Sequence, residues 1–356
     1  MPAGRMTLSK FLIEQLHDHD DHGQLASLLV DITAAVKAIA ALTAKGALGG
    51  YWGRESGSGS MKVDLMAHEE MLRNCEWGGQ LAGMMSRKME RPHSIPKDYK
   101  RGNYLLLYDP LGASSNFDLN GSVGTIFSVL PHAGGEPQVD DYLRPGRELA
   151  AAGYAIYGPA TMLVMTVGKG THAFTLDREI GNFVLTHPDL RVPEDTDEFA
   201  VDMSNERFWE KPVQRYVAEC RDGRTGARER DFNMRWIASM VADVHRILMR
   251  GGVFMDPRGV NDPPRSGGVR LQYVASPMAL IVEQAGGLAS TGRERLLDLV
   301  PADLKEHAPV VLGSRNEVER IVRYHREFDE GTDQPYASPL FNERSLFRDP
   351  PPPPHR

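Results

Sequence analysis

Cysteine is nearly absent from this chain of 356 residues, which contains only Cys75 and Cys220. Two thiols cannot form a disulfide framework or a cysteine-rich metal cluster, so we expect a protein of the reducing cytoplasm. The opening residues, MPAGRMTLSKFLIEQ, lack the apolar block and cleavage site of a secretory signal. No apolar run approaches membrane-spanning length, and we expect no membrane partner.

Positive charge is also in deficit, since the formal net charge is -7. No basic stripe runs through the sequence, and the acidic balance argues against nucleic acid as a partner. What is present is ordinary for a globular protein, with 41% apolar and 25% charged residues. The length is sufficient for a large core and two domains.

Helical and strand-like patterns alternate along the chain. Apolar residues recur at helical spacing in residues 24–44, which predicts an amphipathic helix. Strand-like runs follow at Tyr104–Tyr108, Val123–Leu130, Gly153–Tyr157, Met162–Val167 and Phe183–Thr186. This mixture predicts a layered α/β (α+β) protein in which each of two domains combines helices with a sheet. We place the domains at residues 1–198 and 199–330, followed by a partly disordered, proline-rich tail at 331–356.

The second half carries clearer helix signals. Residues 234–250 show an apolar stripe that begins at Trp236 and continues from Met240 toward Gly251, where a helix is expected to stop. Ser314 and Glu317 have the spacing of a capping box before a final helix.

The stretch YDPLGASSN, residues 108–116, predicts an active-site edge. An apolar strand ends in Asp109, and a turn of small residues follows. Backbone N–H groups around Ala113, Ser114 and Ser115 can hold an anion, because they persist whatever side chains are present.

Several segments in order identify a family. They are YDPLGASSN with SVGTIFSV, PGRELAAAGYAIYGPATMLVMTVG, GNFVLTHPD, FNMRWIASMVADVHRILMRGG, MALIVEQAGG and APVVLGSRNEVER. Over nearly its whole length the chain resembles class 1 fructose-1,6-bisphosphatases of bacterial type. The resemblance implies a layered sugar-phosphatase fold, a homotetramer, and hydrolysis of the 1-phosphate of fructose 1,6-bisphosphate with two or three Mg²⁺ ions held by carboxylates.

The family's metal ligands are retained at few positions. The resemblance places ligands at Asp109 and at the backbone carbonyl of Leu111. In the upstream loop Asp64 matches an acid of the family and is a weak catalytic candidate, whereas Ser58 stands at another acidic position.

The remaining ligand positions are substituted. In SRKME, Arg87 and Lys88 stand where the family has two glutamates; Gly112 replaces an aspartate, and Val274 replaces a glutamate. The two cations remove four units of negative charge, and Gly112 and Val274 remove one each. Like charges about 4 Å apart repel by about 4 kcal/mol at an effective dielectric near 20, and by about twice that against a divalent ion. We therefore expect no working Mg²⁺ cluster, with Arg87 or Lys88 bonded to Asp109 in its place.

The substrate positions are altered less uniformly. Gly268 replaces a phosphate-binding lysine and Asp256 replaces a tyrosine, and an acid there would repel phosphate. Arg235 matches the arginine that family tetramers lend to a neighbouring subunit. The substrate-binding candidates are Ala113, Ser114, Ser115, Asn205, Arg235, Met240 and Arg270.

Plainer interpretations apply elsewhere. SGSGS at 56–60 lacks the lysine of a P-loop and is interpreted as a flexible linker. His245, on a strongly patterned helix, is interpreted as structural, and Asp118 and Glu90 as ordinary surface acids rather than replacement ligands. Met84, Met85 and Met89 are expected to fill the core.

The leading hypothesis is a fructose-bisphosphatase homologue whose Mg²⁺-dependent activity is lost or strongly reduced. It binds a sugar bisphosphate or another small anion, and it assembles as a homotetramer or with a paralogue. Two alternatives stay open: an active fructose-1,6-bisphosphatase with an altered metal site, and a non-catalytic structural or regulatory subunit.

Overall fold

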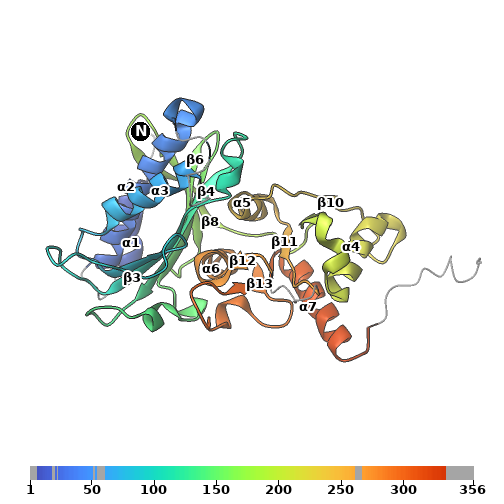
Figure 1. Ribbon diagram of the computed structural model, residues 1–356. Helices are drawn as coiled ribbons and strands as arrows, with labels where there is room; N and C mark the ends of the chain where they lie inside the picture. Colours follow the sequence, from blue (N-terminus) through green and yellow to red (C-terminus); the bar gives the residue numbers. More distant parts are fainter. Residues whose placement is uncertain are drawn as a thin grey trace, which may run out of the picture.

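The computed structural model describes residues 6–17, 21, 23–50, 53, 61–260 and 267–333. Helices and sheets alternate in five layers, as Figure 1 shows. The predicted layered α/β fold is thus confirmed. Ser58, the SGSGS segment and most of the proline-rich tail lie outside the described residues. The α-helices are α1 (Leu8–Leu16), α2 (Gln24–Lys45), α3 (Lys62–Cys75), α4 (Lys211–Asp222), α5 (Met240–Arg250), α6 (Ser276–Gln284) and α7 (Arg315–Asp329).

An eight-stranded sheet forms the second layer. Its strands are β1 (Leu81–Ser86), β2 (His93–Ser94), β3 (Tyr104–Gly112), β4 (Val123–Pro131), β5 (Ala151–Tyr157), β6 (Thr161–Thr166), β7 (Thr171–Asp177) and β8 (Asn182–Leu190). The order is β2-β1-β3-β4-β5-β6-β7-β8, and β1 and β3 are parallel whereas the other neighbours are antiparallel. The five predicted strand runs all fall on strands of this sheet.

A five-stranded sheet in the order β10-β9-β11-β15-β13 forms the fourth layer. Its strands are β9 (Glu198–Ala200), β10 (Asn233–Met234), β11 (Val253–Asp256), β13 (Leu288–Ser290) and β15 (Val310–Gly313). A separate pair joins β12 (Val269–Arg270) to β14 (His307–Ala308). Short helical turns complete the described chain: η1 (Gly46–Gly49), η2 (Ser114–Asn116), η3 (Val139–Tyr142), η4 (Gly146–Glu148), η5 (Met203–Phe208), η6 (Gly223–Thr225), η7 (Leu271–Ala275, π-helical) and η8 (Leu296–Asp298).

Three apolar cores hold the layers together. The first lies between α1–α3 and the eight-stranded sheet, and the central one packs α5 and α6 between the two sheets. The third joins the five-stranded sheet to α4 and α7. Met84 and Met85 are buried in these cores, as predicted, and Met89 packs against the central one.

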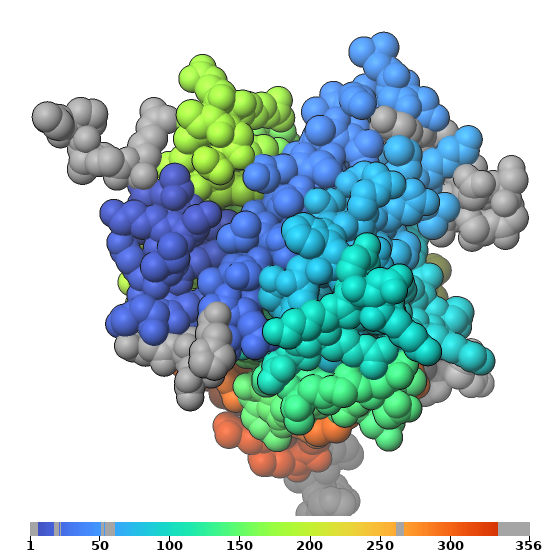
Figure 2. All heavy atoms as spheres, turned by 90° about the vertical axis from the view of Figure 1, so that its left-hand side faces the viewer, coloured from blue at the N-terminus to red at the C-terminus, as the bar shows by residue number. Residues whose placement is uncertain are grey.

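Helix α2 corrects one expectation from the sequence. Together with η1 it forms a 26-residue segment, Gln24–Gly49, whose most apolar 18-residue window has a mean hydropathy of 1.9, so its length and composition would suffice to cross a membrane. Half of its most apolar window is buried within the protein. Packing of α2 and its neighbours on the sheet accounts for this apolarity (Figure 1), and Figure 2 shows the outer face that these helices form.

The start of α5 is a second correction. The stripe that began at Trp236 predicted a helix from residue 234, but the helix begins at Met240, and Met234 belongs to β10. Ala238 adopts a left-handed conformation at φ 58°. The Asp243 carboxylate, inside the helix, accepts from the backbone N–H groups of Ile237 at 3.3 Å and Ser239 at 3.4 Å, which lie before the first helical turn.

The capping box predicted before α7 is absent. The Ser314 hydroxyl accepts from the backbone N–H of Gly252 at 3.2 Å. Glu317 is 1% exposed and accepts from the Arg228 guanidinium at 2.5 and 2.7 Å and from the Tyr216 hydroxyl at 2.7 Å. Both side chains therefore bind residues distant in sequence and do not cap the start of the helix.

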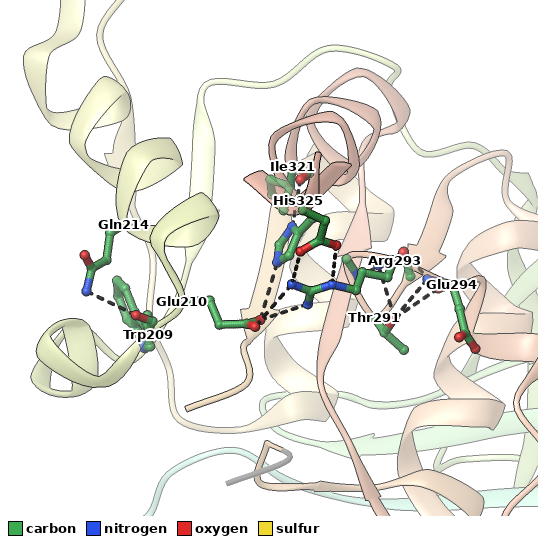
Figure 3. A network of polar contacts seen from close by, with 11 residues as sticks. Trp209, Glu210, Gln214, Thr291, Arg293, Glu294, Ile321 and His325 are labelled. Carbon is green, nitrogen blue, oxygen red and sulfur yellow. Dashed lines mark hydrogen bonds and ion pairs between the residues drawn. The ribbon is translucent and has the colours of Figure 1, made fainter. Parts of the chain in front are cut away.

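A second polar network connects helices α4 and α7 to the five-stranded sheet (Figure 3). Arg293, in the turn after β13, donates to Glu210 at the start of α4 (3.0 Å) and to Asp329 at the end of α7 (2.7 Å). His325 lies beside them, and burial lowers its pKa, which favours the neutral ring. One guanidinium therefore connects three elements that are distant in sequence.

Replacing Glu317 with alanine leaves the buried Arg228 without its counter-charge. We expect a loss of roughly 3 to 5 kcal/mol in the free energy of unfolding, measured by urea denaturation. Tyr216→Phe is the matched control, since it removes one hydrogen bond and should cost about 1 kcal/mol. A loss below that of the control would show that the pair contributes little.

Candidate active site

Three segments bring charged side chains together near the carboxyl ends of β1 and β3 in the eight-stranded sheet. Arg87 directly follows β1, and its backbone N–H donates to the carbonyl of Tyr108 on the parallel strand β3 at 3.0 Å. Asp109 is the next residue on β3. Asp64 lies in the first turn of α3, which packs against the same strand. Strand register thus places a cation beside two acids.

The four side chains form a compact ion-paired cluster. Arg87 Nε lies 2.9 Å from Asp109 Oδ1, and its Nη2 lies 3.5 Å from Asp64 Oδ2. The Lys88 ammonium pairs with Asp64. The expected ion pair between Arg87 and Asp109 is therefore confirmed, whereas Lys88 binds the other acid.

Burial makes this cluster electrostatically demanding. Asp64 is fully buried and Asp109 is 4% exposed. Burial raises the pKa of Asp64, and repulsion from Asp109 adds to this, although Lys88 and Arg87 oppose both. Burial disfavours the charged form of Arg87, but Asp109 and Asp64 outweigh it and raise the pKa of the guanidinium. Two cations thus face the two buried acids.

The cluster forms one wall of a cavity of about 620 Å³, called the first cavity below. Most of the candidate residues meet in it. Its lining comprises Met61, Asp64, Arg87, Lys88, Asp109, Ala113, Ser114, Ser115, Met240, Gly268, Val269, Arg270, Val274 and His307.

The turn after β3 supplies polar groups to this cavity. Ala113 has a left-handed backbone at φ 57°, and the short helix η2 follows it. The Ser114 hydroxyl donates to Asp64 at 3.3 Å. A left-handed residue followed by right-handed ones is the backbone pattern of an anion-binding nest.

Some candidates lie elsewhere. Leu111 is fully buried, and neither it nor Gly112 lines the first cavity. A Cβ atom on Gly112 would lie 3.6 Å from Asp109 Oδ2 and 3.4 Å from the Gly124 carbonyl, which are ordinary contacts. The glycine is therefore not imposed by lack of space. Arg235 is half exposed and lies 3.6 Å from Glu198.

A second cavity of about 210 Å³ contains Asn205 and adjoins the first, since Gly268 lines both. The Asp256 carboxylate lines it and accepts from the backbone N–H of Gly268 at 2.5 Å. Trp236 also lines it and stacks on Phe254 with ring centroids 5.9 Å apart.

Residues interpreted as structural have structural partners. His245 bonds to the Tyr154 hydroxyl at 2.9 Å, and burial lowers its pKa to about 4. Both cysteines are buried, and burial raises the pKa of Cys220 to about 12. Glu90 pairs with Lys305 at 2.7 Å. Asp118 is exposed and does not line the first cavity.

No sequence pattern pointed to His307 as a residue of the site. It reaches the first cavity because its two-residue strand β14 pairs with β12, which sets it opposite Arg270. Strands this short carry no periodicity that a sequence could reveal.

The cavity does not fit Mg²⁺. This ion requires octahedral oxygen ligands, yet Arg87 and Lys88 occupy the positions facing both acids. Among the described residues no group of three or more His, Cys, Asp or Glu side chains could hold a metal ion. Each cation about 4 Å from a divalent ion would repel it by about 8 kcal/mol at an effective dielectric near 20.

Comparisons with known proteins identify the chain's relatives. The family models for the N-terminal and C-terminal domains of fructose-1-6-bisphosphatase match residues 6–188 and 192–326. The chain belongs to the fructose-1,6-bisphosphatase family. It is 53% identical to fructose-1,6-bisphosphatase class 1 of Methylacidiphilum infernorum, over 98% of this chain and all of that protein. It is 51% identical to fructose-1,6-bisphosphatase class 1 3 of Methylibium petroleiphilum, over 98% of this chain and 99% of that one.

Solved structures agree with this membership. Fructose-1,6-bisphosphatase of Leishmania major in its holo form superposes with a TM-score of 0.84 at 32% identity, over 91% of this chain and all of that one. Its apo form gives 0.80, also at 32% identity, over 90% and 99% of the two chains. The fructose-bisphosphatase family is a family of hydrolases of carbohydrate metabolism, and this chain retains its fold while pairing Arg87 and Lys88 with the acids of the first cavity.

Ala113→Gly is expected to stabilise the protein by roughly 0.5 to 1 kcal/mol. Glycine removes the strain of a left-handed alanine, which exceeds the entropy that it adds to the unfolded chain. Thermal unfolding measures the change, and Ala160→Gly on the exposed β5–β6 turn is a control without left-handed strain that should not stabilise. A destabilised Ala113→Gly variant would show that the turn is unstrained.

Proposed function

We propose that this chain is a fructose-bisphosphatase homologue whose Mg²⁺-dependent phosphatase activity is lost or strongly reduced. The observation that supports this is the ion pairing of Arg87 with Asp109 and Asp64, and of Lys88 with Asp64. These contacts leave the acids of the cluster electrically balanced by the protein itself. A divalent ion would have to displace two covalently tethered cations from buried partners, which is strongly unfavourable.

Anion binding is the part of the family function that the first cavity retains. Backbone N–H groups of the turn after β3 and the guanidinium of Arg270 line it.

We propose a small phosphorylated anion as ligand, a cytoplasmic location, and assembly as a homotetramer or with an active paralogue. The homotetramer follows from the family resemblance, in which the residue matching Arg235 contacts a neighbouring subunit.

The purified protein should release no Mg²⁺-dependent phosphate from fructose 1,6-bisphosphate, because Arg87 and Lys88 pair with the acids that a metal ion would need in order to polarise the phosphoryl group. A phosphate-release assay with and without EDTA measures this, alongside a metal-dependent fructose-1,6-bisphosphatase in the same buffer. The matched control is the double variant Asp64→Asn, Asp109→Asn. Phosphate released equally by this variant comes from a contaminant, whereas release by the natural protein alone would establish an active enzyme with an altered metal site.

Calorimetric titration with MgCl₂ should show no binding heat and no change in melting temperature at millimolar Mg²⁺. The comparison is the variant Arg87→Glu, Lys88→Glu, Gly112→Asp, Val274→Glu, which restores carboxylates at four positions. Saturable Mg²⁺ binding by the natural protein, lost in Asp109→Asn, would contradict the proposed function.

A further inference from the structure

The two cavities that meet at Gly268 have opposite electrostatic character. The first cavity has a volume of about 620 Å³ and the second about 210 Å³, and the joined space suits a small metabolite. The described lining of the first includes two acids, three cations and His307; that of the second includes two acids and no lysine, arginine or histidine.

In the first cavity the excess charge is one unit. Arg87 and Lys88 are matched by Asp64 and Asp109. Arg270 is the remaining cation. Within the described part of the chain its guanidinium makes no direct ion pair or hydrogen bond, and Glu90, which it attracts from a distance, is paired with Lys305. One guanidinium with the adjacent backbone N–H groups suits one phosphate group.

The second cavity is lined by two carboxylates, which accept hydrogen bonds, and by one side-chain amide. Asp202 and Asp256 line it with Asn205, whose amide donates to Asp202 at 2.8 Å. Carboxylates accept hydrogen bonds from hydroxyls and repel a second phosphate. The indole of Trp236 adds an apolar surface against which a sugar ring can pack.

We propose that the joined cavities bind a sugar monophosphate and discriminate against a sugar bisphosphate. The phosphate lies in the first cavity, against Arg270 and the turn at Ala113–Ser115, and the hydroxyls of the sugar reach Asp202 and Asn205. This selectivity rests on the proposed function, because a bound Mg²⁺ would add positive charge to the first cavity.

The test is calorimetric titration of the full chain in EDTA with fructose 1-phosphate, fructose 6-phosphate, fructose 1,6-bisphosphate and inorganic phosphate. At least one monophosphate should bind tenfold or more tightly than the bisphosphate, and more tightly than inorganic phosphate. Equal or tighter binding of the bisphosphate overturns the proposal. The proposal is also overturned if neither monophosphate binds more tightly than inorganic phosphate, or if neither monophosphate binds at all.

Variants locate the two ends of the ligand. Arg270→Gln should weaken monophosphate binding at least tenfold, whereas Arg270→Lys, which keeps the charge, should lose less than threefold. Gly268→Lys places a cation between the cavities and should shift the preference at least tenfold toward the bisphosphate, relative to the neutral control Gly268→Met. Unchanged preferences in correctly folded variants overturn the assignment of the two cavities.

The outcomes separate this inference from the proposed function. Binding is measured with metal chelated, so it reports selectivity whether or not Mg²⁺ supports turnover. Mg²⁺-dependent hydrolysis in the separate assay would overturn the proposed function. A bisphosphate preference in EDTA without hydrolysis would overturn the selectivity alone.

Discussion

The site depends on one constraint, which is that two buried carboxylates need positive charge beside them. Asp64 is fully buried and Asp109 nearly so, and an ionised carboxylate in such surroundings is costly unless it is paired. In this chain Arg87 and Lys88 supply that charge. The negative charge of these acids is therefore compensated by side chains of the protein and does not need a bound metal ion.

The fold fixes the position of this compensation. Arg87 emerges from β1 in register with Tyr108, and Asp109 is the next residue of the parallel strand. Because the backbone of Arg87 is hydrogen-bonded to β3, its guanidinium needs to span only the gap between neighbouring strands. Lys88, one residue later, reaches Asp64 on α3 instead. Two adjacent cations thus serve two different elements.

Much of this could be predicted from the sequence. The helix predicted at 24–44 follows from helical periodicity and the strands from short apolar runs, and the family resemblance predicted that Arg87 or Lys88 would bond to Asp109. The start of α5 could not be predicted from the apolar stripe. Ala238 has a left-handed backbone and the Ser239 N–H donates to the Asp243 carboxylate, so the helix begins only after Ser239. Ser314 and Glu317 have capping-box spacing, but both side chains bind tertiary partners. Such long-range contacts, like the strand pairing that brings in His307, have no local sequence signal.

The arrangement divides two tasks that a metal would perform together. Compensation of the buried acids falls to Arg87 and Lys88, whose charges are used within the protein. Attraction of a ligand falls to Arg270, on a different strand and opposite His307. Because the compensating cations are matched one to one, the net charge of the first cavity depends on Arg270 alone among its lysine and arginine side chains. The two buried acids are therefore compensated by the protein itself, and under the proposed function a single remaining arginine sets how many phosphate groups the cavity attracts.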